Sequence, residues 1–112
     1  MRVVCMELRK RVRYRLRANA VFTWGGVEHR RFRGEGATRD ISLTGVFIFT
    51  LTCPPVGTAV HLEVFLFALA GGKRHLLMKT EATVIRVEHA NGGGEGFAVV
   101  TEGITLAEGS NR

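Results

Sequence analysis

The sequence predicts an all-β fold in which about six short antiparallel strands form a barrel or a compact sandwich. Three observations support this prediction. Apolar and polar residues alternate with a period of two in several segments, turns rich in glycine or proline separate these segments, and no segment has a sustained helical period. Closing the strands into a barrel would also remove unpaired sheet edges.

The chain is predicted to form one domain. It has 112 residues, of which 46% are hydrophobic, so it can bury a core without disulfides or metals. We assign residues 1–10 to an N-terminal arm, 11–103 to the β-domain and 104–112 to a C-terminal tail. The segment "TEGITLAEGSNR" is short and ends in glycine and polar residues, which predicts that a C-terminal helix is short or absent.

The first strand is predicted from the alternation that begins at residue 11. Odd positions carry arginines and then Asn19, and "Gly25-Gly26" ends the pattern with a turn. The apolar residues at even positions are Val12, Tyr14, Leu16, Ala18, Ala20, Phe22 and Trp24. These side chains are expected to face the core.

Five further strands are predicted along the chain. They are "GATRDI" (36–41), "GVFIFT" (45–50), "TAVHLEVFLF" (58–67), "LLMKTEATVIRVEHA" (76–90) and "FAVV" (97–100). Pro54-Pro55, "AGGKR" and "NGGGEG" mark the turns between the later ones. In the third of these strands, Val60, Leu62 and Val64 are expected to point inward, and Leu66 is the next position of the same series.

A basic cluster near the N-terminus suggests an anionic partner. The net charge is +6, and six of the nine residues from 9 to 17 are basic. Most are arginines, whose planar fork pairs with phosphate and with the O6/N7 edge of guanine. A solvated strand face is the alternative explanation. Arg11 and Arg15 share one face whether the segment is extended or helical.

The stretch "DISLTG" (40–45) has two interpretations. As a turn, it would use Asp40 and Ser42 to bind local backbone N–H groups and Gly45 to supply a positive φ. As a binding loop, it would use the carboxylate to accept from guanine, the hydroxyl to donate to phosphate, and glycine to let a ligand approach the backbone.

Together the two features resemble PilZ domains. "RVRYR" (11–15) fits the R-x-x-x-R pattern of that family, and "DISLTG" fits its D/N-x-S-x-x-G pattern at every fixed position. Their order is also similar to the family, as are the strand "ANAVFTW" and the late segment "GFAVV". The resemblance covers nearly the whole chain.

PilZ domains are bacterial receptors for cyclic di-GMP, and the resemblance implies a six-stranded antiparallel barrel with this ligand and no cofactor. It implies that Arg11 and Arg15 hold guanine and phosphate, while Asp40, Ser42 and Gly45 line the opposite wall. The ligand-bound surface would be read by a downstream protein partner. Two other registers of the arginine motif remain open, Arg9 with Arg13 and Arg13 with Arg17.

Two other functions are weighed against this one. A basic barrel could bind RNA or single-stranded DNA, with Tyr14 or Trp24 as stacking platforms, but both lie on the apolar face of the predicted strand. A degenerate PilZ domain could contact only proteins, but the motif residues are intact.

Several classes of function are not expected. The four histidines lack metal-ligand spacing, no nucleophile–base pair stands out, and the chain is not expected to be an enzyme. Neither a signal peptide nor a membrane span is predicted, because the apolar runs are too short. Two distant cysteines, Cys5 and Cys53, fit a reducing compartment, so a cytoplasmic location is expected.

Overall fold

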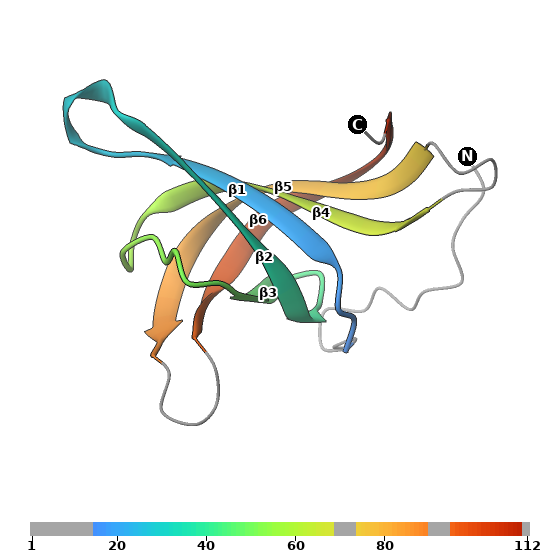
Figure 1. The fold of residues 1–112 in the computed structure, drawn as a ribbon, viewed down its shortest axis with the longest axis horizontal. Helices are drawn as coiled ribbons and strands as arrows, with labels where there is room; N and C mark the ends of the chain where they lie inside the picture. The colour runs from blue at the N-terminus through green and yellow to red at the C-terminus, as the bar shows by residue number, and fades with distance from the viewer. Residues whose placement is uncertain (1–14, 69–73, 90–94, 111–112) are drawn as a thin grey trace.

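Six antiparallel strands close into a barrel, which confirms the predicted all-β barrel and excludes the sandwich alternative. The computed structural model describes residues 15–68, 74–89 and 95–110. Around the barrel the strands follow the order β1-β2-β3-β6-β5-β4 (Figure 1). The strands are β1 (Asn19–Gly25), β2 (Arg31–Ile41), β3 (Gly45–Phe49), β4 (Ala59–Ala68), β5 (Arg74–Glu88) and β6 (Gly96–Ser110).

The alternating residues of β1 and β4 fill the barrel as expected. Ala20, Phe22 and Trp24 are buried, and so are Val60, Leu62 and Val64 of β4. These two strands pair with each other and close the barrel. Phe22 meets Phe97 of β6 edge-to-face, with ring centroids 4.8 Å apart, so the core joins opposite walls of the barrel.

Two strand boundaries differ from the sequence prediction. β1 begins at Asn19, and residues 15–18 precede it without strand pairing, while residues 11–14 lie outside the described part of the chain. β6 continues to Ser110 and pairs with β5, so 104–110, expected as tail, are strand. Ile104 and Leu106 explain this extension, because both pack against the core. The described ranges contain no α-helix, only the short 3₁₀ segment Val27–His29, and therefore no helix long and apolar enough to cross a membrane.

Two β-bulges, one in β2 and one in β5, lie beside the same cross-strand row of the barrel wall. In β2 the pairing with β3 skips from Thr38 to Asp40, which leaves Arg39 as the extra residue. In β5 the pairing with β6 skips from Val84 to Arg86, which leaves Ile85 as the extra residue. A bulge interrupts the in–out alternation and re-aims side chains. It is the reason that Arg39 and Asp40, although adjacent, both reach the outer surface.

The hairpin between β1 and β2 projects from the barrel (Figure 1) and has a strained tip. Its connecting segment η1 (Val27–His29) holds Glu28 at φ 59° and His29 at φ 62°, in the left-handed region. We expect the double substitution Glu28→Asn with His29→Gly to raise the free energy of unfolding by about 1 kcal/mol, because both new residues tolerate this conformation better. Urea denaturation would measure the change.

A matched control tests that the gain comes from the turn. Glu102 is an exposed glutamate in β6. Glu102→Asn should leave stability unchanged or lower it, because asparagine is a poor strand former. An unchanged or lower denaturation midpoint for the double variant would contradict the left-handed turn.

Candidate functional site

The outer surface of the barrel carries a groove formed by β2, β3, β5, β6 and the turn between β2 and β3. Its volume is about 400 Å³. Asp40, Ser42 and Gly45 all line it, so the barrel brings together the three residues for which the family resemblance implies one wall. The other lining residues are Arg39, Thr44, Val46, Phe47, Ile85, Arg86, Ala98, Val99 and Val100.

Ser42 holds the turn at one end of the groove. Its Oγ accepts from the backbone N–H groups of Thr44 (3.3 Å) and Gly45 (3.1 Å), and its own N–H donates to the Gly45 carbonyl oxygen at 2.9 Å. From β6, the Thr101 hydroxyl donates to the Leu43 carbonyl oxygen at 2.7 Å. The turn is therefore fixed from inside and from the neighbouring strand. Ser42 is the turn residue that one interpretation of the sequence required.

Gly45 is needed for space and not for its φ angle. Among the described glycines only Gly57 has a positive φ, so the suggestion that Gly45 supplies one is wrong. A Cβ on Gly45 would lie 3.0 Å from the Val99 carbonyl oxygen, closer than most real Cβ contacts. The missing side chain lets β3 lie close to β6 and leaves the groove open at this point.

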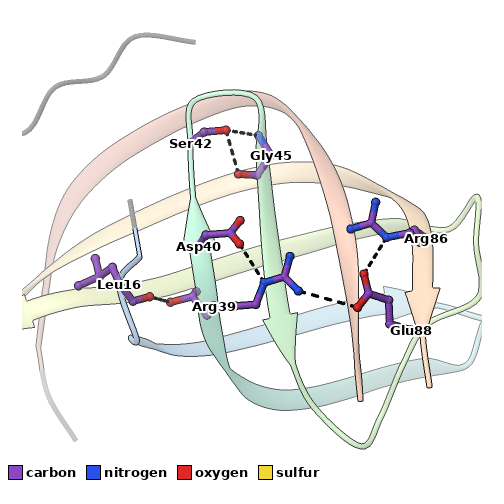
Figure 2. A network of polar contacts seen from close by, with 8 residues as sticks. Leu16, Arg39, Asp40, Ser42, Gly45, Arg86 and Glu88 are labelled. Atoms are coloured by element: carbon purple, nitrogen blue, oxygen red, sulfur yellow. Dashed lines mark hydrogen bonds and ion pairs between the residues drawn. The ribbon is translucent and has the colours of Figure 1, made fainter. Parts of the chain in front are cut away.

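Asp40 is held by a side chain and not by the turn. Its Oδ2 accepts from the Nε–H of Arg39 at 2.9 Å (Figure 2), and no backbone donor binds its carboxylate in the described part of the chain. The Arg39 guanidinium lies over the ring of Phe47, 3.9 Å from the centroid. Asp40 therefore presents a fixed carboxylate whose second oxygen remains able to accept.

The segment before β1 is tied to β2 close to Asp40. Thr38 is fully buried, and its hydroxyl donates to the Leu16 carbonyl oxygen and accepts from the Ala18 N–H at 2.9 Å. These bonds fix the backbone that follows Arg15, whose own side chain is exposed. Arg17 lies over the ring of Phe49 at 5.3 Å, and neither Arg15 nor Arg17 lines the groove in the free protein. The predicted partner of Arg15, Arg11, lies outside the described residues.

Three charged residues of the site were missed by the sequence analysis. Glu88 joins two arginines: its carboxylate accepts from the Arg86 Nε–H at 2.9 Å and lies 3.8 Å from the nearest nitrogen of Arg39 (Figure 2). The segment "TRDI" contains Arg39, but only the bulge turns it outward beside Asp40. The pairing of β5 with β6 aligns Arg86 with this group, and no local sequence signal indicates that.

Other chemically notable residues lie away from the groove. Burial, and secondarily the charge of Glu95, raises the pKa of the Cys53 thiol, which makes it a poor nucleophile. A hydrogen bond to Glu81, with a second one to Glu63, raises the pKa of His61 against the opposing effect of burial. Within the described ranges, no group of three or more potential ligands could hold a metal ion.

Trp24 offers no stacking platform for a base. It is only 8% exposed, and it stacks on Phe22 at 5.8 Å and on Phe32 at 5.3 Å between ring centroids. Its ring is therefore occupied by the core and by β2. This geometry removes one of the two aromatic residues on which an RNA-binding or DNA-binding barrel would depend; the other, Tyr14, lies outside the described residues.

The comparison with protein families agrees with the geometry. A family model described as PilZ domain matches residues 7–111, nearly the whole chain, including both motifs. The search of curated proteins and the search of solved structures each give no match. The barrel and the matched span together lead to one conclusion: the chain belongs to the PilZ domain family.

Proposed function

We propose that this chain is a receptor for cyclic di-GMP that binds the dinucleotide in the groove of β2, β3, β5 and β6. The observation that carries the proposal is that Asp40, Ser42 and Gly45 line one groove with arginines at its rim. Asp40 accepts hydrogen bonds from a guanine edge, Ser42 donates to phosphate, and Gly45 leaves room for close approach. The groove volume of about 400 Å³ falls in the range of small-molecule sites.

In this proposal the arginine motif supplies the other wall of the site. Arg11 and Arg15 bind phosphate and guanine, and the ligand draws their segment onto the barrel beside Asp40. The Thr38 anchor supports this arrangement, because it fixes the backbone next to Arg15 while leaving the arginine side chain exposed. The surface so formed is read by a protein partner, and the chain acts as an adaptor and not as an enzyme.

Calorimetric titration with cyclic di-GMP tests the proposal, with GMP and cyclic di-AMP as controls. We expect cyclic di-GMP to bind more tightly than either control, because only it offers two guanine edges and two phosphates together. If micromolar cyclic di-GMP produces no heat and no shift in melting temperature, the receptor function is wrong. The domain would then act through protein contacts alone.

Arg15→Lys separates a guanine reader from a general binder of nucleic acids. Lysine keeps the charge but lacks the planar fork, so we expect cyclic di-GMP affinity to fall about ten- to a hundredfold. Weak binding to random oligonucleotides should persist, because it depends on the number of charges. Titration of both ligands at two salt concentrations measures the difference.

Arg17→Lys is the matched control. Arg17 is stacked on Phe49 and lies outside the proposed register of Arg11 and Arg15, so this variant should bind cyclic di-GMP nearly as the parent does. The opposite result, a loss with Arg17→Lys and none with Arg15→Lys, would move the motif to the register of Arg13 and Arg17.

A further inference from the structure

Charged residues from β2 and β5 meet above the floor of the groove. Strand pairing places Asp40, Phe47, Ala98 and Arg86 in one row across β2, β3, β6 and β5. Because the side chain of Ala98 is only a methyl group, it makes a shallow depression between Phe47 and Arg86. Arg39 leans over Phe47 from one side, and Arg86 approaches from the other. The two guanidinium groups thus border one shallow space.

The two bulges explain why both arginines face this space. Arg39 is the extra residue of β2, and Arg86 follows Ile85, the extra residue of β5. Bulges are found beside binding sites because they redirect side chains. Here they direct two cations from opposite sides toward the groove that already contains Asp40, Ser42 and Gly45.

Glu88 occupies the space between the two arginines. One of its oxygens accepts from the Arg86 Nε–H at 2.9 Å, and the other is 3.8 Å from Arg39 (Figure 2). At 3.8 Å, Glu88 and Arg39 form an ion pair without a hydrogen bond. The network contains two arginines and the carboxylates of Asp40 and Glu88, so its formal charges cancel. A carboxylate bridging two arginines has the chemistry of a bound phosphate.

The bridge is weak enough to be displaced. The side chains of Arg39, Glu88 and Arg86 are 34%, 39% and 52% exposed, and ion pairs as accessible as this contribute little to stability. The Glu88 carboxylate can therefore leave the two arginines and become solvated at a small cost in free energy. A phosphate diester can accept two parallel N–H bonds from each guanidinium, which the present geometry of Glu88 does not achieve.

We infer that Arg39 and Arg86 form an additional anion subsite for one phosphate of the ligand, and that the Glu88 carboxylate occupies it in the free protein. This inference rests on the proposed function, since the phosphate is that of cyclic di-GMP. Glu88 then acts as an internal competitor: it lowers affinity and keeps two arginines from binding other anions. Arg39 has a second task, because the same guanidinium orients Asp40.

The test compares Glu88→Gln with the parent by calorimetric titration with cyclic di-GMP. Removing the competing charge should tighten binding about fivefold. Glu35→Gln is the control, because it also removes one negative charge from an Arg–Glu pair, that of Arg33 and Glu35, outside the groove. Its affinity should change less than twofold. In an Arg86→Gln background, Glu88→Gln should give a clearly smaller gain, because the hydrogen-bonded partner of Glu88 is gone and only the Arg39 half of the subsite remains.

The outcomes separate this inference from the proposed function. If the parent binds cyclic di-GMP and Glu88→Gln binds no more tightly than Glu35→Gln does, the subsite is wrong and the receptor function stands. An undiminished gain from Glu88→Gln in the Arg86→Gln background would also overturn the subsite. If neither the parent nor Glu88→Gln binds, both proposals fail. Binding by Glu88→Gln alone would support the subsite, while the receptor function of the parent chain would be wrong.

Discussion

Thr38→Val is expected to lower the free energy of unfolding by about 2–4 kcal/mol and to weaken cyclic di-GMP binding as well. Valine has nearly the shape of threonine, so packing of this fully buried side chain is kept. The hydroxyl is lost, and with it the bonds to the Leu16 carbonyl oxygen and the Ala18 N–H. Each polar group left without its partner costs about 1–3 kcal/mol. Urea denaturation and calorimetric titration measure the two effects.

Thr38→Ser provides the control for this prediction. Serine keeps the hydroxyl and loses one methyl group, which costs about 1 kcal/mol. We expect it to retain ligand binding, because the backbone beside Arg15 stays attached to β2. If Thr38→Val loses stability but binds cyclic di-GMP as tightly as Thr38→Ser, the anchor supports the fold alone and does not position the arginine segment.

The barrel could be predicted because its strands carry a local signal. Alternation identified every second residue of β1 and β4 as buried, because a period of two shows directly which face of a strand meets the core. These residues are Ala20, Phe22, Trp24, Val60, Leu62 and Val64. The same rule failed at the ends of strands. β1 starts later than the alternation, because Arg15 and Arg17 continue the pattern before Asn19 without strand pairing. β6 is longer than predicted, because Ile104 and Leu106 pack against the core, and no local sequence pattern indicates these contacts.

The candidate site could be predicted in part. Asp40, Ser42 and Gly45 are close in sequence, so one turn brings them together whatever the rest of the barrel does. Arg86 and Glu88 are on β5, and they join the site only through the pairing of β3 with β6 and of β6 with β5. Alternation also predicts that Arg39 and Asp40 face opposite sides of the sheet. The bulge that places them together depends on the partner strand, which local patterns do not report.

The structure also divides the two tasks that the sequence had combined in one motif. Ser42 satisfies the backbone of the turn, and Thr101 fixes the turn to β6. Asp40 takes no part in these bonds and is held by Arg39. A residue that the turn does not need is one whose charge is available for a ligand. This separation makes the substitution of Asp40 the clearest test of the proposed wall.

Asp40→Ala is expected to weaken cyclic di-GMP binding about tenfold to a hundredfold with little change in stability. In the proposed site the carboxylate accepts from guanine, and hydrogen bonds to a charged group contribute about 1.5–3 kcal/mol. Among the described residues the carboxylate pairs with Arg39 alone; the two side chains are 34% (Arg39) and 19% (Asp40) exposed, and such a partly accessible pair contributes about 1 kcal/mol. Calorimetric titration and thermal denaturation of one variant measure both quantities.

Asp40→Asn completes this experiment, because asparagine keeps a carbonyl acceptor and removes the charge. We expect its affinity to lie between those of the parent and Asp40→Ala, since one guanine N–H can still be accepted while the bond from Arg39 weakens. A purely structural role makes the opposite prediction: a lower melting temperature for Asp40→Ala at near-parental affinity. If the parent, Asp40→Asn and Asp40→Ala bind with equal affinity, Asp40 does not contact the ligand, and binding in the groove depends on the arginines instead.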